Sequence, residues 1–124
     1  MIKGLPPGTI LQLLYLKERL AAVRPGRFVE IGPGAGHITA LLLESGWTGV
    51  VFDLDPITID ALSSRFRDFI GPGRLTLHTA DFTASGSLVG EPVDLVISCM
   101  VMEHLHEDQE TAFMLAASQV LQAG

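Results

Sequence analysis

The chain has 124 residues, a length that supports one domain with its own hydrophobic core. Its net charge is −6, with eight Lys and Arg against fourteen Asp and Glu, so the basic face typical of nucleic-acid-binding proteins is not expected. The single cysteine, Cys99, excludes an internal disulfide and a cysteine-rich metal site. No apolar run approaches the ~20 residues of a membrane span, and residues 1–7 lack the apolar core of a secretory signal. We therefore expect a soluble, cytoplasmic protein.

The first predicted element is a helix that begins at Thr9, because Thr9 and Gln12 form a capping box and leucines then recur at helical spacing. It ends at Pro25-Gly26. Three further helices are predicted where a helical pattern lies between turn residues, over 37–45, 56–70 and 107–122. The last helix is expected to bury Phe113, Leu115, Ala116, Val120 and Leu121.

Four short apolar runs alternate with these helices and predict buried parallel strands, over 28–31, 49–52, 75–79 and 93–98. Parallel strands joined through helices form right-handed crossovers, which favours an α/β fold with helices on both faces of the sheet. Residues 83–92 are expected to form a loop or a loose helical turn. We treat residues 1–124 as a single domain.

Three glycines at alternate positions, Gly32, Gly34 and Gly36, follow the first predicted strand and precede a helix. Glycine allows sharp turns and a close approach of the backbone to a ligand, because it has no Cβ. The amides at the start of the next helix favour an anionic group at the same place. A tight strand-to-helix turn alone does not need three glycines, so the pattern favours a nucleotide-type ligand.

Polar residues follow the other predicted strands. Asp53 ends the second strand about 20 residues after Gly32, the separation at which a carboxylate meets ribose hydroxyls in such sheets. Asp55 precedes Pro56 and is expected to cap the next helix instead. Asp81 follows the third strand, and Ser98 ends the fourth. Since ligands of open α/β sheets bind at the carboxyl ends of the strands, all four ends indicate one site.

The glycine spacing separates two nucleotide classes. A dinucleotide fingerprint, Gly-x-Gly-x-x-Gly, requires glycine at position 37, where this chain has His37. The pattern Glu30-x-Gly32-x-Gly34-x-Gly36 instead resembles the first motif of the class I S-adenosylmethionine-dependent methyltransferases. This resemblance extends over nearly the whole chain from about residue 9. It implies a Rossmann-like, three-layer αβα domain with strands in the order 3-2-1-4.

The resemblance also implies roles for individual residues. Glu30 and the three glycines match the motif that wraps the amino-acid part of S-adenosylmethionine, and Asp53 matches the acid that holds the ribose. Asp81 and Phe82 match the pair that flanks the adenine, although Phe82 is equally consistent with a core position. Ser98 begins the segment that matches the fourth motif.

His104 lies at the expected end of the fourth strand region and is the candidate catalytic base, because its pKa suits proton removal from an acceptor. Glu103 and His104 could instead belong only to the junction that begins the next helix. Some relatives bind a divalent metal here through Glu-x-x-Glu-His. Met100 replaces the first of those glutamates, so no metal is expected. The Asn/Asp-Pro-Pro-aromatic motif of methyltransferases that act on bases is also absent, with 98–101 reading Ser-Cys-Met-Val.

The resemblance implies a seven-stranded sheet, and this chain carries only the first four strands. We therefore expect a truncated form of the family fold whose exposed fourth strand favours a homo-oligomer or a completing partner chain. The expected function is methyl transfer to a small-molecule or lipid-like acceptor. The alternative is a module that binds S-adenosylmethionine or S-adenosylhomocysteine without turnover. A nicotinamide-dependent reductase half is disfavoured by His37 and by the lack of a Tyr-x-x-x-Lys pair.

Overall fold

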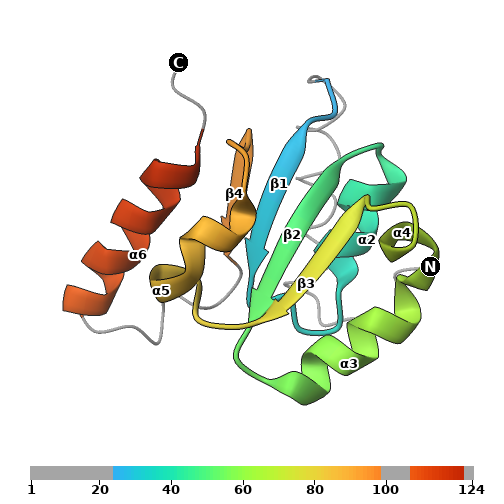
Figure 1. The fold of residues 1–124 in the computed structure, drawn as a ribbon, viewed down its shortest axis with the longest axis horizontal. Helices are drawn as coiled ribbons and strands as arrows, with labels where there is room; N and C mark the ends of the chain where they lie inside the picture. Colours follow the sequence, from blue (N-terminus) through green and yellow to red (C-terminus); the bar gives the residue numbers. More distant parts are fainter. Residues whose placement is uncertain (1–23, 99–106, 122–124) are drawn as a thin grey trace, which may run out of the picture.

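The computed structural model describes residues 24–98 and 107–121 (Figure 1). Four strands form one parallel sheet in the order β3-β2-β1-β4. The strands are β1 (Arg27–Ile31), β2 (Thr48–Asp53), β3 (Leu75–Thr79) and β4 (Leu95–Ser98). The predicted strands and their 3-2-1-4 order are therefore confirmed. The fourth strand begins two residues later than expected, because Val93 instead forms an isolated parallel bridge with Leu121.

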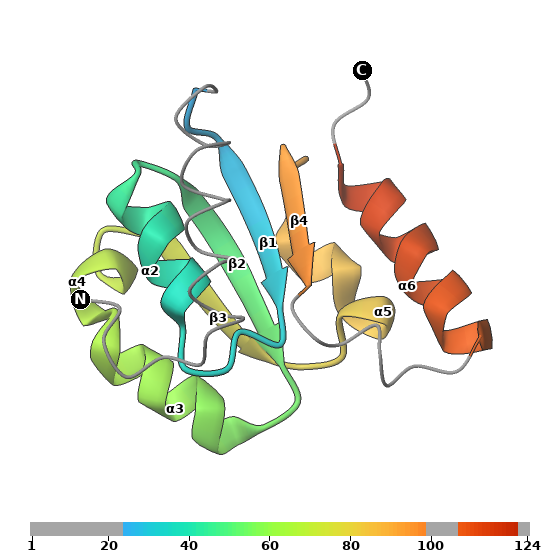
Figure 2. The ribbon, with the colours of Figure 1, turned by 180° about the vertical axis from the view of Figure 1, so that it is seen from behind.

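Helices cover both faces of the sheet, as Figures 1 and 2 show. One face carries α2 (His37–Glu44), α3 (Pro56–Arg65) and the short α4 (Arg67–Ile70). The other carries α5 (Phe82–Ser85), the 3-10 turn η1 (Gly86–Val89) and α6 (Glu107–Val120). The expected three-layer αβα arrangement is confirmed. The first predicted helix, from Thr9, lies outside the described residues.

Alternate residues of the strands supply two hydrophobic cores, because successive side chains of a strand point to opposite faces. Phe28 and Val51 pack with α2 and α3, in a core that includes Leu42 and Leu62. Val29 and Phe52 pack on the other face with α5 and α6. The two central strands, β1 and β2, are thus buried from both sides.

Two sequence predictions about helices were wrong. The predicted helix over 56–70 breaks at Phe66, whose backbone leaves the helical region with φ −108° and ψ 25° and whose ring is buried in the core. On α6, Leu115 is 59% exposed, not buried as expected. Leu121, which was also expected to be buried, is 39% exposed. Ala116 and Val120 are buried as expected, together with Ala117. The side chain of Phe113 lies outside the described residues.

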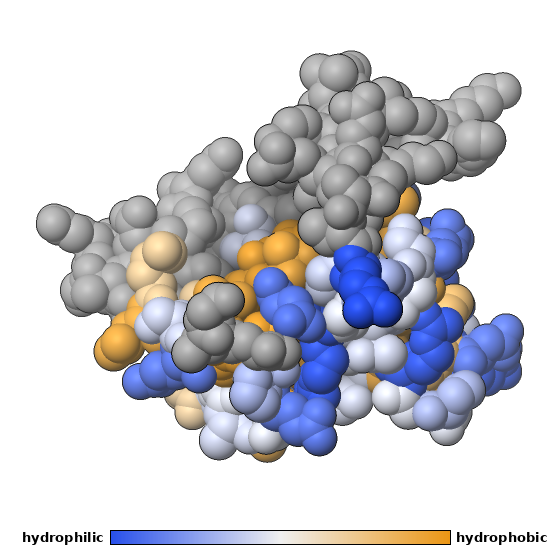
Figure 3. Space-filling model, turned by 90° about the horizontal axis from the view of Figure 1, so that it is seen from above, coloured by the Kyte–Doolittle hydropathy of each residue, from blue (hydrophilic) through white to orange (hydrophobic). Residues whose placement is uncertain are grey.

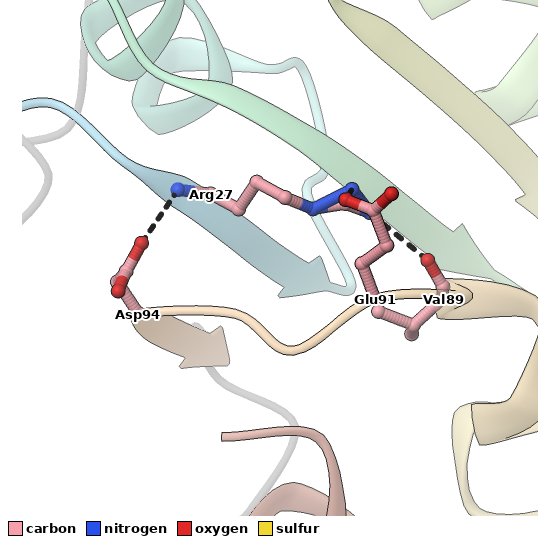
Figure 4. Close-up of polar contacts among 4 residues, drawn as sticks. All are labelled: Arg27, Val89, Glu91 and Asp94. Atoms are coloured by element: carbon pink, nitrogen blue, oxygen red, sulfur yellow. Dashed lines mark hydrogen bonds and ion pairs between the residues drawn. The ribbon is translucent and has the colours of Figure 1, made fainter. Parts of the chain in front are cut away.

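A polar cluster ties together the amino ends of β1 and β4 (Figure 4). The Arg27 backbone N–H donates to Asp94 Oδ2 at 3.0 Å, and Arg27 Nη2 donates to the Val89 carbonyl at 2.9 Å. Arg27 Nη1 also lies 3.4 Å from the exposed Glu91 carboxylate. Figure 3 looks onto this end of the sheet, where hydrophilic side chains border an apolar strip. The cluster is structural, and it lies at the opposite end from the predicted site.

Candidate functional site at the carboxyl ends of the strands

The sheet register brings the predicted site residues to one edge. Ile31, which precedes the glycine loop, lies beside Phe52 of β2 and Ser98 of β4. Asp53 in turn lies beside Thr79 of β3. The carboxyl ends of all four strands therefore meet where open α/β sheets bind their ligands.

The glycine loop contains three residues in the left-handed region. Gly32, Gly34 and Gly36 have φ values of 68°, 58° and 88°, a conformation that costs other residues about 1–2 kcal/mol. The Gly32 N–H donates to the Phe52 carbonyl at 3.0 Å, and the Gly36 N–H donates to the Pro33 carbonyl at 3.0 Å. The loop is therefore a defined turn anchored to β2.

The glycines at 34 and 36 serve different purposes. A Cβ at Gly34 would meet no described atom within 4 Å, so this residue is exposed beside open space. A Cβ at Gly36 would lie only 2.7 Å from Leu62 of α3 and 3.0 Å from Phe66, the C-cap of that helix. Gly34 thus leaves room at the surface of the loop, whereas Gly36 allows α3 to pack beneath it.

The start of α2 faces this loop without a side-chain cap. Its N-cap is Gly36, and no side chain of the described residues accepts from the first amides of the helix. Uncapped amides at a helix start carry partial positive charge and favour an anionic ligand group. The glycine loop and α2 together therefore suit the carboxylate of an amino acid or a phosphate.

Glu30 lies beneath the loop rather than on its surface. It is 1% exposed, and the Thr39 hydroxyl of α2 donates to Glu30 Oε1 at 2.5 Å. Burial raises the pKa of Glu30 to about 7, although the Thr39 hydrogen bond partly opposes this shift. The carboxyl group therefore links β1 to α2 and supports the loop from inside the fold.

The two aspartates after β2 have separate roles. Asp55 is the N-cap of α3: its Oδ1 accepts from the Ile57 N–H at 2.9 Å, and its Oδ2 accepts from the Thr58 hydroxyl at 3.3 Å. The predicted capping role of Asp55 is thus confirmed. Asp53 Oδ1 accepts from the Asp55 N–H at 2.8 Å, which fixes the orientation of the Asp53 carboxylate at the strand end.

The two predicted site residues after β3 have structural roles, one as a helix cap and the other in the hydrophobic core. Asp81 caps α5, because its Oδ1 accepts from the Thr83 N–H at 3.0 Å and from the Thr83 hydroxyl at 2.7 Å. Phe82 is 2% exposed, and its ring lies 5.3 Å from that of Phe52. Phe82 therefore occupies the core, and an adenine contact by either residue stays a prediction.

At the end of β4, the Ser98 hydroxyl is buried and has no hydrogen-bond partner among the described residues. It lies beside Ile31 in the sheet, next to the start of the glycine loop. The segment that follows, with Cys99, Met100 and His104, lies outside the described residues. Within the described ranges, no three His, Cys, Asp or Glu residues gather as metal ligands. The roles of Ser98 and His104 stay predictions.

Two exposed apolar side chains at this edge were not predicted from the sequence. Leu54 is 72% exposed between Asp53 and Asp55, and Ile57 is 77% exposed in the first turn of α3. The sequence signal for Leu54 was its position between Asp53 and Asp55, directly after a buried strand. A third missed residue is Arg65, whose Nη1 donates to the Ala35 carbonyl in the glycine loop.

A parallel β3-β2-β1-β4 sheet with a glycine loop after β1 and an acid after β2 defines a Rossmann-like nucleotide-binding protein. Residues 28–124 match the family described as the methyltransferase domain. This chain belongs to that family, and the resemblance to S-adenosylmethionine-dependent methyltransferases is confirmed. S-adenosylmethionine is the methyl donor of the family.

Solved methyltransferases share the fold at low sequence identity. The N-methyltransferase NodS from Bradyrhizobium japonicum, in complex with S-adenosylhomocysteine, superposes with a TM-score of 0.77 and 21% identity over 99% of this chain and 61% of that one. Magnesium protoporphyrin IX methyltransferase from Synechocystis PCC 6803, with bound S-adenosylmethionine, gives a TM-score of 0.76 and 17% identity. That match covers 93% of this chain and 55% of that one.

Curated relatives match a shorter region at higher identity. Ribosomal RNA small subunit methyltransferase A of Methylococcus capsulatus is 44% identical over 69 residues, which is 53% of this chain and 26% of the relative. A probable enzyme of the same name from Methanospirillum hungatei is 47% identical over 57 residues, 45% of this chain and 22% of the relative. The chain thus spans about a quarter of the length of these relatives.

Proposed function

We propose that this chain binds S-adenosylmethionine at the carboxyl edge of its sheet and transfers the methyl group to a small-molecule or lipid-like acceptor. The observation that carries the proposal is the open glycine loop, with exposed Gly34 and the uncapped start of α2, beside the oriented carboxylate of Asp53. An anion-binding loop and a ribose-binding acid are the two features that this cofactor needs.

In this proposal the amino-acid part of the cofactor lies over Gly32, Gly34 and Gly36. The Asp53 carboxylate accepts from the two ribose hydroxyls, since one carboxylate offers two oxygens. The exposed side chain of Leu54, next to Asp53, supplies apolar surface for the adenine ring. Asp81, Phe82 and Ser98 remain candidate contacts, and Glu30 supports the loop from below.

The cofactor supplies an activated methyl group on a sulfonium, which reacts by in-line displacement. The protein then has to align the acceptor with that methyl group and exclude other orientations. Where the acceptor atom carries a proton, a base must accept it, and His104 is the candidate. No metal site is proposed. Among the described residues, no helix is long and apolar enough to cross a membrane, and the cytoplasmic location stays a prediction.

The curated relatives favour a second candidate acceptor, which is RNA. Their names describe ribosomal RNA methyltransferases, and the first of them is 44% identical over 69 residues of this chain. Two sequence features favour the small-molecule acceptor: the net charge of −6 and the absence of the Asn/Asp-Pro-Pro-aromatic motif. A third candidate is a module that binds the cofactor without turnover, alone, as a homo-oligomer or with a completing partner chain.

Transfer of a radioactive methyl group tests these candidates together. The chain is incubated with methyl-labelled S-adenosylmethionine and a cell extract separated into lipid, small-molecule and RNA fractions. Label in the first two fractions supports the proposal, and label in the RNA fraction alone supports the second candidate. Donor binding without label in any fraction supports the non-catalytic module. Asp53→Ala is the variant that should strongly reduce labelling when S-adenosylmethionine is limiting.

A further inference from the structure

Helix α3 connects the two halves of the candidate cofactor site. It begins at its N-cap Asp55, two residues after Asp53, and ends at Arg65. The Arg65 side chain is exposed at the carboxyl end of the helix, and its Nη1 donates to the carbonyl of Ala35 at 2.5 Å. One short helix therefore links the segment that carries Asp53, the proposed ribose ligand, to the glycine loop.

Apolar packing places Arg65 close to this loop. Leu62 is 1% exposed and Phe66 is 4% exposed, and both lie against Gly36, where a Cβ would clash with them. Arg65 lies between these two residues in sequence, and its guanidinium carbon is 5.0 Å from the centroid of the Phe66 ring. The guanidinium is thus held over an aromatic face while it reaches the loop.

The hydrogen bond from Arg65 acts on one particular peptide group. The Ala35 carbonyl and the Gly36 N–H belong to the same planar unit, so a donor that holds the oxygen also orients the N–H. That N–H donates to the Pro33 carbonyl at 3.0 Å, and Gly36 is the N-cap of α2. Because glycine at 34 and 36 leaves the neighbouring dihedrals free, this contact limits the loop conformations.

We propose that Arg65 is a positioning residue that holds the glycine loop in the conformation that receives the amino-acid part of the methyl donor. The inference rests on the proposed function, and it assigns to Arg65 a contact with the loop and none with the adenosine part. It therefore predicts a difference between ligands that contain the amino-acid part and ligands that lack it.

Isothermal titration with two ligands tests this inference. S-adenosylhomocysteine carries the amino-acid part, whereas 5′-methylthioadenosine keeps the adenosine and the sulfur but lacks it. Arg65→Ala should weaken S-adenosylhomocysteine binding about tenfold, as expected for loss of a charge-assisted hydrogen bond, and change 5′-methylthioadenosine binding less than twofold. Arg65→Lys, which restores a charged donor, should recover part of the affinity.

The control is Arg67→Ala, an exposed arginine two residues further on, which should bind both ligands like the wild type. Equal weakening of both ligands by Arg65→Ala, or no weakening of either, would overturn the inference. Failure of the wild-type chain to bind S-adenosylhomocysteine would instead contradict the proposed function itself, and the inference would fall with it. Thermal unfolding of each variant separates a lost fold from a lost contact.

Discussion

The hydroxyl of Thr39 donates to the buried carboxyl group of Glu30 at 2.5 Å, which joins the end of β1 to the first turn of α2. These two elements lie on either side of the glycine loop, so the hydrogen bond fixes the distance between the two ends of the loop. Because Glu30 is 1% exposed, the protonation state of its carboxyl group affects the stability of the folded chain.

The first prediction concerns the dependence of stability on pH. The pKa of Glu30 is raised by burial from 4.5 to about 7, so between these values the folded chain binds a proton that the unfolded chain releases. The contribution of this group is therefore fully present below pH 4.5 and is lost as the pH rises through 7. We expect a loss of roughly 3 kcal/mol in the free energy of unfolding across this range.

Urea unfolding of the wild type and of Glu30→Gln at several pH values measures this effect. Glutamine keeps the shape and the hydrogen bond to Thr39 but does not titrate. The difference in unfolding free energy between the two proteins should therefore move in favour of the variant as the pH rises. A difference that is constant from pH 4.5 to 8 would show that Glu30 has the same pKa in the folded and unfolded chains, which contradicts the raised pKa.

The second prediction separates the glycines at 34 and 36. Gly34→Ala should lower the free energy of unfolding by about 1–2 kcal/mol, the cost of a left-handed alanine, because its Cβ meets open space. Gly36→Ala should cost several kcal/mol, since its Cβ also clashes with Leu62 and Phe66. Only the first variant should fold well and yet lose affinity for S-adenosylhomocysteine. Similar destabilisation by both substitutions would contradict the assignment.

The third prediction compares the two aspartates after β2. Asp53→Ala should weaken S-adenosylmethionine binding roughly 10- to 100-fold, as expected when hydrogen bonds to a charged group are removed. Asp55→Ala removes the cap of α3 and should lower the free energy of unfolding by about 1 kcal/mol, with a smaller effect on binding. Calorimetric titration and thermal unfolding of both variants measure the two effects, and equal losses of affinity would show that Asp53 is not the ribose ligand.

The fourth prediction concerns the polar cluster at the opposite end of the sheet. Glu91 is 75% exposed, so Glu91→Ala should change the free energy of unfolding by less than about 1 kcal/mol. Arg27→Ala should be more costly, because it also removes the donor to the Val89 carbonyl, which is partly buried. Neither change should affect cofactor affinity. A loss of affinity in either variant would link this end of the sheet to the site.

Local patterns were sufficient to predict the four parallel strands, whereas their 3-2-1-4 order was implied by the family resemblance. Apolar runs such as 28–31 and 49–52 are unfavourable when exposed to water, so they are predicted to form buried strands. The turn residues between them set the boundaries of the strands and helices. The break at Phe66 could not be predicted in this way, since it depends on where that ring finds space in the core. For the same reason the exposure of Leu115 follows from the contacts of α6 and not from its own hydrophobicity.

The candidate site shows the same division. The spacing of Gly32, Gly34 and Asp53 predicts a cofactor site. The glycines act through their backbone conformation and Asp53 acts through its place at the end of a strand, and both features can be read from local sequence. The different tasks of Gly34 and Gly36 depend on the packing of α3, which is distant in sequence. The contact between Arg65 and Ala35 joins residues 30 positions apart and has no local signal.

The central claim is that this chain binds S-adenosylmethionine, and calorimetric titration of the folded wild-type chain tests it most directly. S-adenosylmethionine, S-adenosylhomocysteine and NADPH are titrated separately, with circular dichroism to establish that the protein is folded. We predict that the first two ligands bind with one site per chain and dissociation constants on the order of micromolar, and that NADPH does not bind. A folded chain that binds NADPH, or that binds neither S-adenosyl ligand, would contradict the claim.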